Sequence, residues 1–212
     1  MDYIAELYQG RKEIWDLDVQ EVSMYGCAEA GLEGLLTQSA VNINTTLITK
    51  SLGDMTAAEF NVIGSGLIQA YRTNCFRTAY PDTFIIPEDD HISLGRQMSE
   101  TYPLRTKLSV LEEVLQKVTG NANFKILPLS YAMQSYNSAI TGLNKNRYVL
   151  TRQNRNSLRM DIPLNFTVTL PNSLDNMTYN SAAYGRFTGT TAIVTGKQIG
   201  RASCRERVSS PV

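Results

Sequence analysis

The spacing of apolar side chains predicts a long amphipathic helix over residues 3–24. At about 100° per residue, one arc of this helix carries Ile4, Leu7, Tyr8, Ile14, Trp15, Val19 and Val22. Gly10 lies within the helix and is its weak point, because glycine is a poor helix former. The first segment of the chain is therefore expected to be helical over most of its length.

Two more helices are predicted in the middle of the chain. One begins with a capping box formed by Thr56 and Glu59. Its apolar face carries Phe60, Ile63, Leu67 and Tyr71, with Gly64 and Gly66 allowing close packing on that face. The other has Pro103 near its start and Gly120 as its stop, and its apolar stripe consists of Leu104, Leu108, Leu111, Leu115 and Val118.

Short apolar runs predict strands between and after these helices. Thr83–Ile86 is closed by Pro87, and Phe124–Leu127 ends at Pro128. Alternating patterns then predict strands at Tyr148–Leu150, Leu158–Ile162 and Asn165–Leu170 and in a last region from Tyr179 to Val194. The change from helical to alternating periodicity predicts an α+β fold with antiparallel strands after residue 145.

Composition narrows the classes of protein that the chain can represent. Its 212 residues fit one large domain or two small intertwined ones. The chain has 20 basic residues (Lys+Arg) and 20 acidic residues (Asp+Glu), so its formal net charge is zero. Such a chain lacks the excess of positive charge that is typical of tight nucleic-acid binding. It also has little charge repulsion to oppose self-association. No apolar run approaches the ~20 residues of a membrane helix. Three cysteines and one histidine predict neither a disulfide framework nor a zinc site, and no cofactor is expected.

Glycines at positions 26, 31 and 34 interrupt the chain after the first helix. A phosphate-binding loop would need Gly-x-Gly-x-x-Gly or a Lys-Ser/Thr ending, and neither is present. The alternative is a structural turn that brings Leu32, Leu35 and Leu36 into the core.

Candidate catalytic and metal-binding residues cluster around residue 90. The adjacent acids Glu88, Asp89 and Asp90 are either a metal site or the solvated start of a helix, where acids are favoured. His91 is the one histidine of the sequence and therefore the candidate proton shuttle. With Ser93 or Ser130 and these acids it suggests a small hydrolase, although nothing in the sequence fixes their geometry. The alternative is an ordinary surface histidine.

A basic, asparagine-rich stretch surrounds the predicted strands at 148–150 and 158–162. It contains Lys145, Arg147, Arg152, Arg155 and Arg159. Three interpretations remain open: a nucleic-acid patch, a subunit contact in which arginines pair with a neighbour's carboxylates, and a solvated hairpin rim. Only Tyr148 is available as an interleaved stacking aromatic, which weakens the first interpretation.

Several segments together resemble the major capsid proteins of tailed bacteriophages with the Hong Kong 97-type fold. Gly31–Leu36, followed by Ala40 and Val41, resembles the Gly-Leu-x-Gly-Leu-Leu motif that follows the family's long spine helix. The resemblance continues through 142–150, 157–163 and 183–189, in order, and covers most of residues 1–194. No catalytic motif belongs to it.

The resemblance implies a shell subunit and not an enzyme. Residues 1–50 would form the spine helix and the start of a peripheral region, and residues 51–198 mainly an axial region with return strands. The subunit would self-assemble into hexamers and pentamers of an icosahedral head around double-stranded DNA, without sequence-specific binding or a membrane. Scaffold and portal proteins are further expected partners, and the location is the virion after synthesis in the host bacterial cytoplasm. A bacterial nanocompartment shell, a small hydrolase and a tail or adaptor protein remain alternatives.

Both ends of the chain depart from the family pattern. The family's N-terminal arm and extended loop would precede the first helix, which leads us to expect a chain truncated at that end. Ile199–Val208 resembles a translated sequencing adapter. Residues 199–212 are therefore expected to be a non-native tail that packs poorly, and Cys204 is expected to belong to no biological site. The 212-residue chain is accordingly expected to form small oligomers or irregular aggregates and not closed shells.

Overall fold

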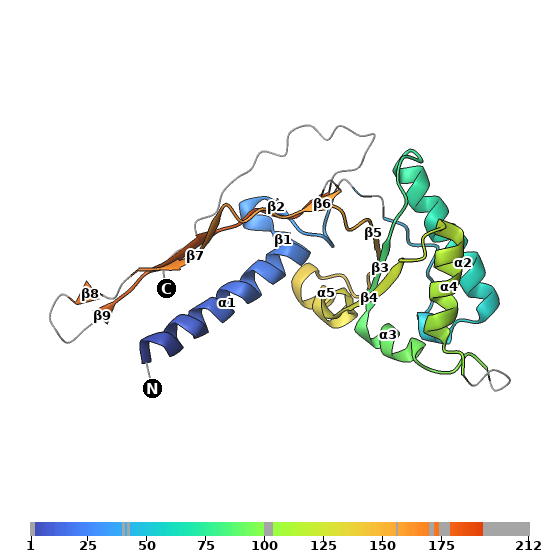
Figure 1. Ribbon diagram of the computed structural model, residues 1–212, viewed down its shortest axis with the longest axis horizontal. Coiled ribbons are helices and arrows are strands. Elements are labelled where there is room, and N and C mark those ends of the chain that lie inside the picture. Colours follow the sequence, from blue (N-terminus) through green and yellow to red (C-terminus); the bar gives the residue numbers. More distant parts are fainter. Residues whose placement is uncertain are drawn as a thin grey trace. The chain divides into compact units, whose positions relative to one another are not determined.

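The computed structural model describes residues 3–39, 41, 43–99, 104–155, 157–169, 172–173 and 179–192. These residues form two compact units. The first unit contains the chain up to Gln38 together with Arg159–Ala192, and the second contains Ser39–Leu158. The second unit is therefore an insertion between two parts of the first, as the colours along the chain in Figure 1 show.

The first unit consists of one long helix and short strands. Helix α1 (Tyr3–Tyr25) confirms the predicted N-terminal helix. It leads into β1 (Gly26–Cys27), the short helix η1 (Ala28–Ala30) and β2 (Leu32–Glu33), and β1 pairs antiparallel with β2. The returning chain forms β6 (Leu158–Arg159), β7 (Leu164–Val168), β8 (Asn172–Ser173), β9 (Tyr179–Asn180), β10 (Ala183–Arg186) and β11 (Thr191–Ala192). Both β7 with β10 and β8 with β9 pair antiparallel.

Trp15 attaches α1 to the strands of the first unit. Its side chain is 8% exposed, and its ring centroid lies 5.8 Å from that of Phe166 on β7 and 5.0 Å from that of Phe187. A Cβ atom at Gly185 on β10 would come within 2.6 Å of the indole ring. The absence of a side chain at residue 185 therefore makes room for the tryptophan.

Most of the predicted apolar arc of α1 is not buried within the chain. Ile14 is 62% exposed, and Leu7 and Tyr8 are more than 40% exposed. Within the described residues of its unit, α1 contacts mainly the short strands β1, β2 and β7, which cover little of its length. The arc predicted the helix correctly, but it does not mark a core face in this chain.

The glycine-rich segment is a tight structural turn, as expected, but Leu32, Leu35 and Leu36 are only half-buried and do not belong to the core. Gly26 adopts a φ of 75°, and a Cβ atom there would lie 2.2 Å from the backbone oxygen of Leu32. A Cβ atom at Gly34 would lie 2.3 Å from the backbone nitrogen of Gly26. Only glycine lets the two backbones approach this closely, which explains the spacing of these residues.

The second unit packs helices on a mixed three-stranded sheet. Strand β3 (Thr83–Pro87) is central, parallel to β4 (Lys125–Leu129) and antiparallel to β5 (Val149–Thr151). The helices are η2 (Leu52–Asp54), α2 (Ala57–Asn74), α3 (Glu88–Leu94), α4 (Lys107–Thr119), η3 (Ser130–Ala132) and α5 (Gln134–Thr141). Helices α2 and α4 run side by side (Figure 1).

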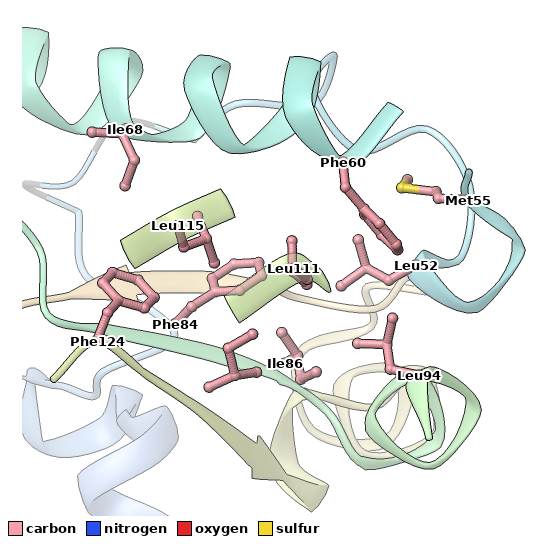
Figure 2. Packing of buried hydrophobic residues seen from close by; sticks show 11 residues of the cluster. Leu52, Met55, Phe60, Ile68, Phe84, Ile86, Leu94, Leu111, Leu115 and Phe124 are labelled. Carbon is pink, nitrogen blue, oxygen red and sulfur yellow. The ribbon is translucent and has the colours of Figure 1, made fainter. Parts of the chain in front are cut away.

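The core of the second unit lies between α2, α4 and the sheet. Figure 2 shows Phe84 and Ile86 of β3 facing Leu111 and Leu115 of α4, with Phe60 above them. Each of these side chains is at most 1% exposed. Burial of an apolar side chain of this size contributes about 1.5–3 kcal/mol. The hydrophobic effect therefore holds this unit together around β3.

Helix α2 begins as predicted, whereas α4 does not. Thr56 and Glu59 form both hydrogen bonds of the capping box. Helix α4 starts only at Lys107, because the Thr106 side chain caps it by accepting a hydrogen bond from Ser109 N. Leu104 therefore precedes the helix and is 98% exposed, so its predicted place in the apolar stripe is wrong. Gly120 ends the helix in a left-handed conformation, as expected.

Several other sequence predictions differ from the structure. Helix α5 was not predicted, and β6 ends at Arg159 although the expected strand ran from Leu158 to Ile162. The expected last strand region is divided into β9, β10 and β11. Pro103 and the predicted tail at 199–212, including Cys204, lie outside the described residues.

Candidate assembly surface

The basic stretch begins on a loop that a buried asparagine holds in place. The side chain of Asn137 on α5 is fully buried, and its amide donates hydrogen bonds to the backbone oxygens of Ala132 (3.1 Å) and Lys145 (3.0 Å). The Asn146 side chain accepts a hydrogen bond from Gln134 N at 2.8 Å. The asparagines in this stretch therefore build the loop between α5 and β5.

The basic side chains around this loop are mostly exposed. Lys145 projects from the loop, and Arg152 and Arg155 follow β5 in an exposed segment. Arg147 is half-buried and donates a hydrogen bond to the Thr141 hydroxyl at 3.3 Å. All four residues belong to the second unit, and Lys145, Arg152 and Arg155 are its exposed members of the basic stretch.

The expected hairpin around these residues is not present. Strand β5 pairs with β3, with Thr151 opposite Thr83, and not with β6. Arg159 belongs to the first unit, where its guanidinium forms an exposed ion pair with Asp161 at 3.5 Å. Arg159 therefore belongs to a different unit from the other four basic residues.

A buried carboxylate ties the start of β5 to the rest of the second unit. Asp90 on α3 is 4% exposed and accepts hydrogen bonds from the Ser51 hydroxyl (2.5 Å) and from the Tyr148 hydroxyl. Burial and the neighbouring carboxylate raise the pKa of Tyr148, so the phenol stays protonated and remains a donor. Sequence analysis missed this network, because its three members are far apart in the chain.

The residues of the hypothetical hydrolase do not form a catalytic relay. The Asp90 carboxylate accepts hydrogen bonds from the Ser51 and Tyr148 hydroxyls. The Ser93 hydroxyl donates to the backbone oxygen of Asp90 at 2.8 Å. The Ser130 hydroxyl donates to Glu88 Oε2 at 2.6 Å. His91 is half-buried on α3. The geometry therefore provides no activated serine beside the histidine in the described residues.

The other candidate sites also take structural roles. Within the described ranges, no group of three potential metal ligands lies close enough to hold an ion. Asp90 faces the protein interior, whereas Glu88 and Asp89 are exposed at the start of α3. Cys75 is buried, which raises the pKa of its thiol, and it forms no disulfide with Cys27. None of the described helices has the length and apolar character needed to cross a membrane.

Comparisons with known proteins agree with this structural role. A chain of "The capsid of Myoviridae Phage XM1" has a similar fold, with a TM-score of 0.72 and 14% sequence identity. The match covers 98% of this chain and 65% of that capsid chain, so this chain spans about two thirds of its length. No curated protein matches the sequence. The likeness confirms the expected α+β capsid fold. The family model described as "Major capsid protein" matches residues 6–202, and the chain therefore belongs to the major capsid protein family.

Proposed function

We propose that the protein is a structural subunit that self-assembles into an icosahedral phage head enclosing double-stranded DNA. The observation that carries this proposal is the family match over residues 6–202. The first unit, with α1, would form the peripheral region of the subunit, and the second unit would form the axial region. The subunit works by packing and not by catalysis.

Assembly proceeds through contacts that are individually weak. A closed shell surrounds every subunit with several neighbours, so modest contacts add up to a stable particle. Lys145, Arg147, Arg152 and Arg155 form one contact, in which arginines pair with carboxylates of neighbouring subunits in hexamers and pentamers. Arg159 contributes to a separate contact on the first unit. Scaffold and portal proteins bind the same subunits during head formation.

The genome is held by confinement inside the shell. The chain has 20 basic and 20 acidic residues, and its basic stretch is divided between two units. Tight nucleic-acid binding instead requires a basic patch or stripe on one face. The protein is made in the host bacterial cytoplasm and becomes part of the virion.

Self-association of the purified chain tests this proposal. Sedimentation velocity and negative-stain microscopy near neutral pH should show small oligomers or irregular aggregates whose size grows with protein concentration. Uniform closed particles would support the shell function and contradict only the expectation that this chain alone cannot close a shell. A monodisperse monomer that hydrolyses ester or phosphoester substrates, and loses this activity in His91→Ala, would contradict the shell function.

A further inference from the structure

A basic hollow lies on the surface of the second unit between α2 and α4. It has a volume of about 300 Å³ and is lined by Ser65, Ile68, Gln69, Arg72, Thr73, Arg77 and Val118. The two arginines bring two permanent positive charges to one small site. The hydroxyls of Ser65 and Thr73 are bonded to their own helix, so the guanidinium groups dominate the chemistry of the hollow.

Arg72 is fixed beside the hollow but lacks a counter-charge. Its guanidinium carbon lies 4.4 Å from the ring centroid of Tyr80, a cation–π contact that orients the group. Its Nε atom is covered by protein and has no hydrogen-bond acceptor. The covered Nε atom is not accessible to a ligand, so Arg72 can bind an oxyanion only through its terminal nitrogens.

Arg77 is placed at the hollow by the way α2 ends. Phe76 and Arg77 both adopt left-handed conformations, with φ values of 50° and 61°, although neither is glycine. The Arg77 N–H donates to the backbone oxygen of Arg72 at 2.6 Å, which folds the chain back over the last turn. Together with the bond from Phe76 N–H to the backbone oxygen of Thr73 at 3.2 Å, this is a Schellman cap, a common helix end that places Arg77 beside the last turn.

No carboxylate of the chain neutralises these two arginines in the described part of the structure. The ion pairs of that part are Lys50–Glu59, Arg105–Glu113, Lys117–Glu113 and Arg159–Asp161. Two arginines that line one hollow, and that form no ion pair with an acid of the described residues, favour an oxyanion, which guanidinium groups can bind through bidentate hydrogen bonds. A ligand with a carboxylate would supply the missing counter-charge.

The surroundings of the hollow favour a protein partner over DNA. Ile68 and Val118 line the hollow together with the two arginines, and Phe76, next to Arg77 in the sequence, is 61% exposed, so apolar side chains accompany the charged groups. Arginine anchors within an apolar surround are typical of protein interfaces, whereas DNA-binding proteins present extended basic tracks. The chain also offers complementary charge, because Asp16, Asp18 and Glu21 are exposed on α1.

We infer that the hollow formed by Arg72 and Arg77 binds a carboxylate side chain of a second copy of this chain. The inference rests on the proposed function, since assembly of identical subunits supplies the second copy. It adds a contact distinct from the basic stretch at 145–155. The carboxylate accepts hydrogen bonds from the guanidinium groups of the two arginines that line the hollow.

Sedimentation velocity of the full chain tests the inference with matched charge removals. Arg77→Gln should weaken self-association about tenfold, because loss of one partner of an interfacial charge pair commonly costs this much or more. Arg77→Lys should retain part of the affinity, and Arg72→Gln with Arg77→Gln should weaken it further. Arg96→Gln is the control, since Arg96 is an exposed arginine of the same unit. Circular dichroism verifies folding, and Arg77→Gln leaves the Arg72–Tyr80 contact intact.

The possible outcomes separate this inference from the proposed function. If the wild-type chain self-associates and Arg77→Gln behaves like Arg96→Gln, the inference is wrong and the shell function stands. If the wild-type chain remains monomeric at every concentration, no second copy occupies the hollow and the shell function fails as well. If a short DNA duplex binds in an Arg77-dependent way while self-association is unchanged, the occupant is a phosphate and the inference is overturned.

Discussion

Replacement of Trp15 by alanine should destabilise the first unit more than any change on the exposed face of α1. Trp15 is 8% exposed and contacts the rings of Phe166 and Phe187. A tryptophan buries roughly 150–250 Å², which at about 25 cal/mol per Å² corresponds to about 4–6 kcal/mol. Unfolded chains already bury part of this area, so the figure is an upper bound. We expect a loss of about 3–5 kcal/mol, as for other large-to-small changes in a core.

Urea unfolding followed by far-UV circular dichroism measures the stability that Trp15→Ala removes. Hydrogen exchange shows which part of the chain loses it. Fluorescence is unsuitable, because the change removes the single tryptophan of the chain. A chain with two compact units need not unfold in one step, so protection of individual amides is the sharper measurement. Protection should fall in α1, β7 and β10 and remain unchanged in β3.

Ile14→Ala is the matched control, because Ile14 is adjacent in sequence and 62% exposed. Its effect should stay within about 0.5 kcal/mol, as is usual for surface substitutions. Equal effects of the two substitutions would refute the claim that Trp15 attaches α1 to the hairpin. A loss of protection in β3 comparable to that in α1 would refute the local character of the contact.

Two further predictions concern α2. Gly64→Ala should destabilise the protein by about 0.5–2 kcal/mol in urea unfolding. The new Cβ would lie 2.7 Å from Val114 Cγ1, and this overpacking outweighs the better helix propensity of alanine. A more stable variant would contradict the close packing of Gly64. The hydrogen bond from Lys50 and the bonds from Thr56 lower the pKa of Glu59 from 4.5 to about 2. Because the folded-state pKa is depressed, the stabilisation by Glu59 is present above pH 4.5 and is lost as the pH falls towards 2. NMR of the side-chain carboxyl group measures the titration of Glu59. Glu59→Gln should abolish the corresponding pH dependence of stability. A titration midpoint near pH 4.5 would show that the capping box is not formed.

Local features of the sequence predicted the helices best. The capping box at Thr56 and Glu59 was visible because both residues lie within one turn. Helix α5 was missed because it spans only eight residues and its N-cap, Met133, provides no side-chain hydrogen bond. The start of α4 was misplaced because the cap at Thr106 competes with a plausible apolar pattern that includes Leu104.

Features that depend on distant parts of the chain were not predictable from the sequence. The basic residues were recognised by type, but the pairing of β5 with β3 placed them on loops and not on a hairpin. The network of Asp90 with Ser51 and Tyr148 joins segments 39 and 58 residues apart. The hollow at Arg72 and Arg77 requires α2 and α4 to pack together, which no local pattern determines.

The most direct test of the shell function is the protein content of DNA-filled particles from cells that carry the gene. Particles should be treated with nuclease, purified by density and analysed by quantitative mass spectrometry. If the shell function is correct, peptides from both units of this chain belong to the most abundant protein of the nuclease-resistant fraction. Peptides confined to the soluble cell extract, with a different protein forming the shell, would contradict it.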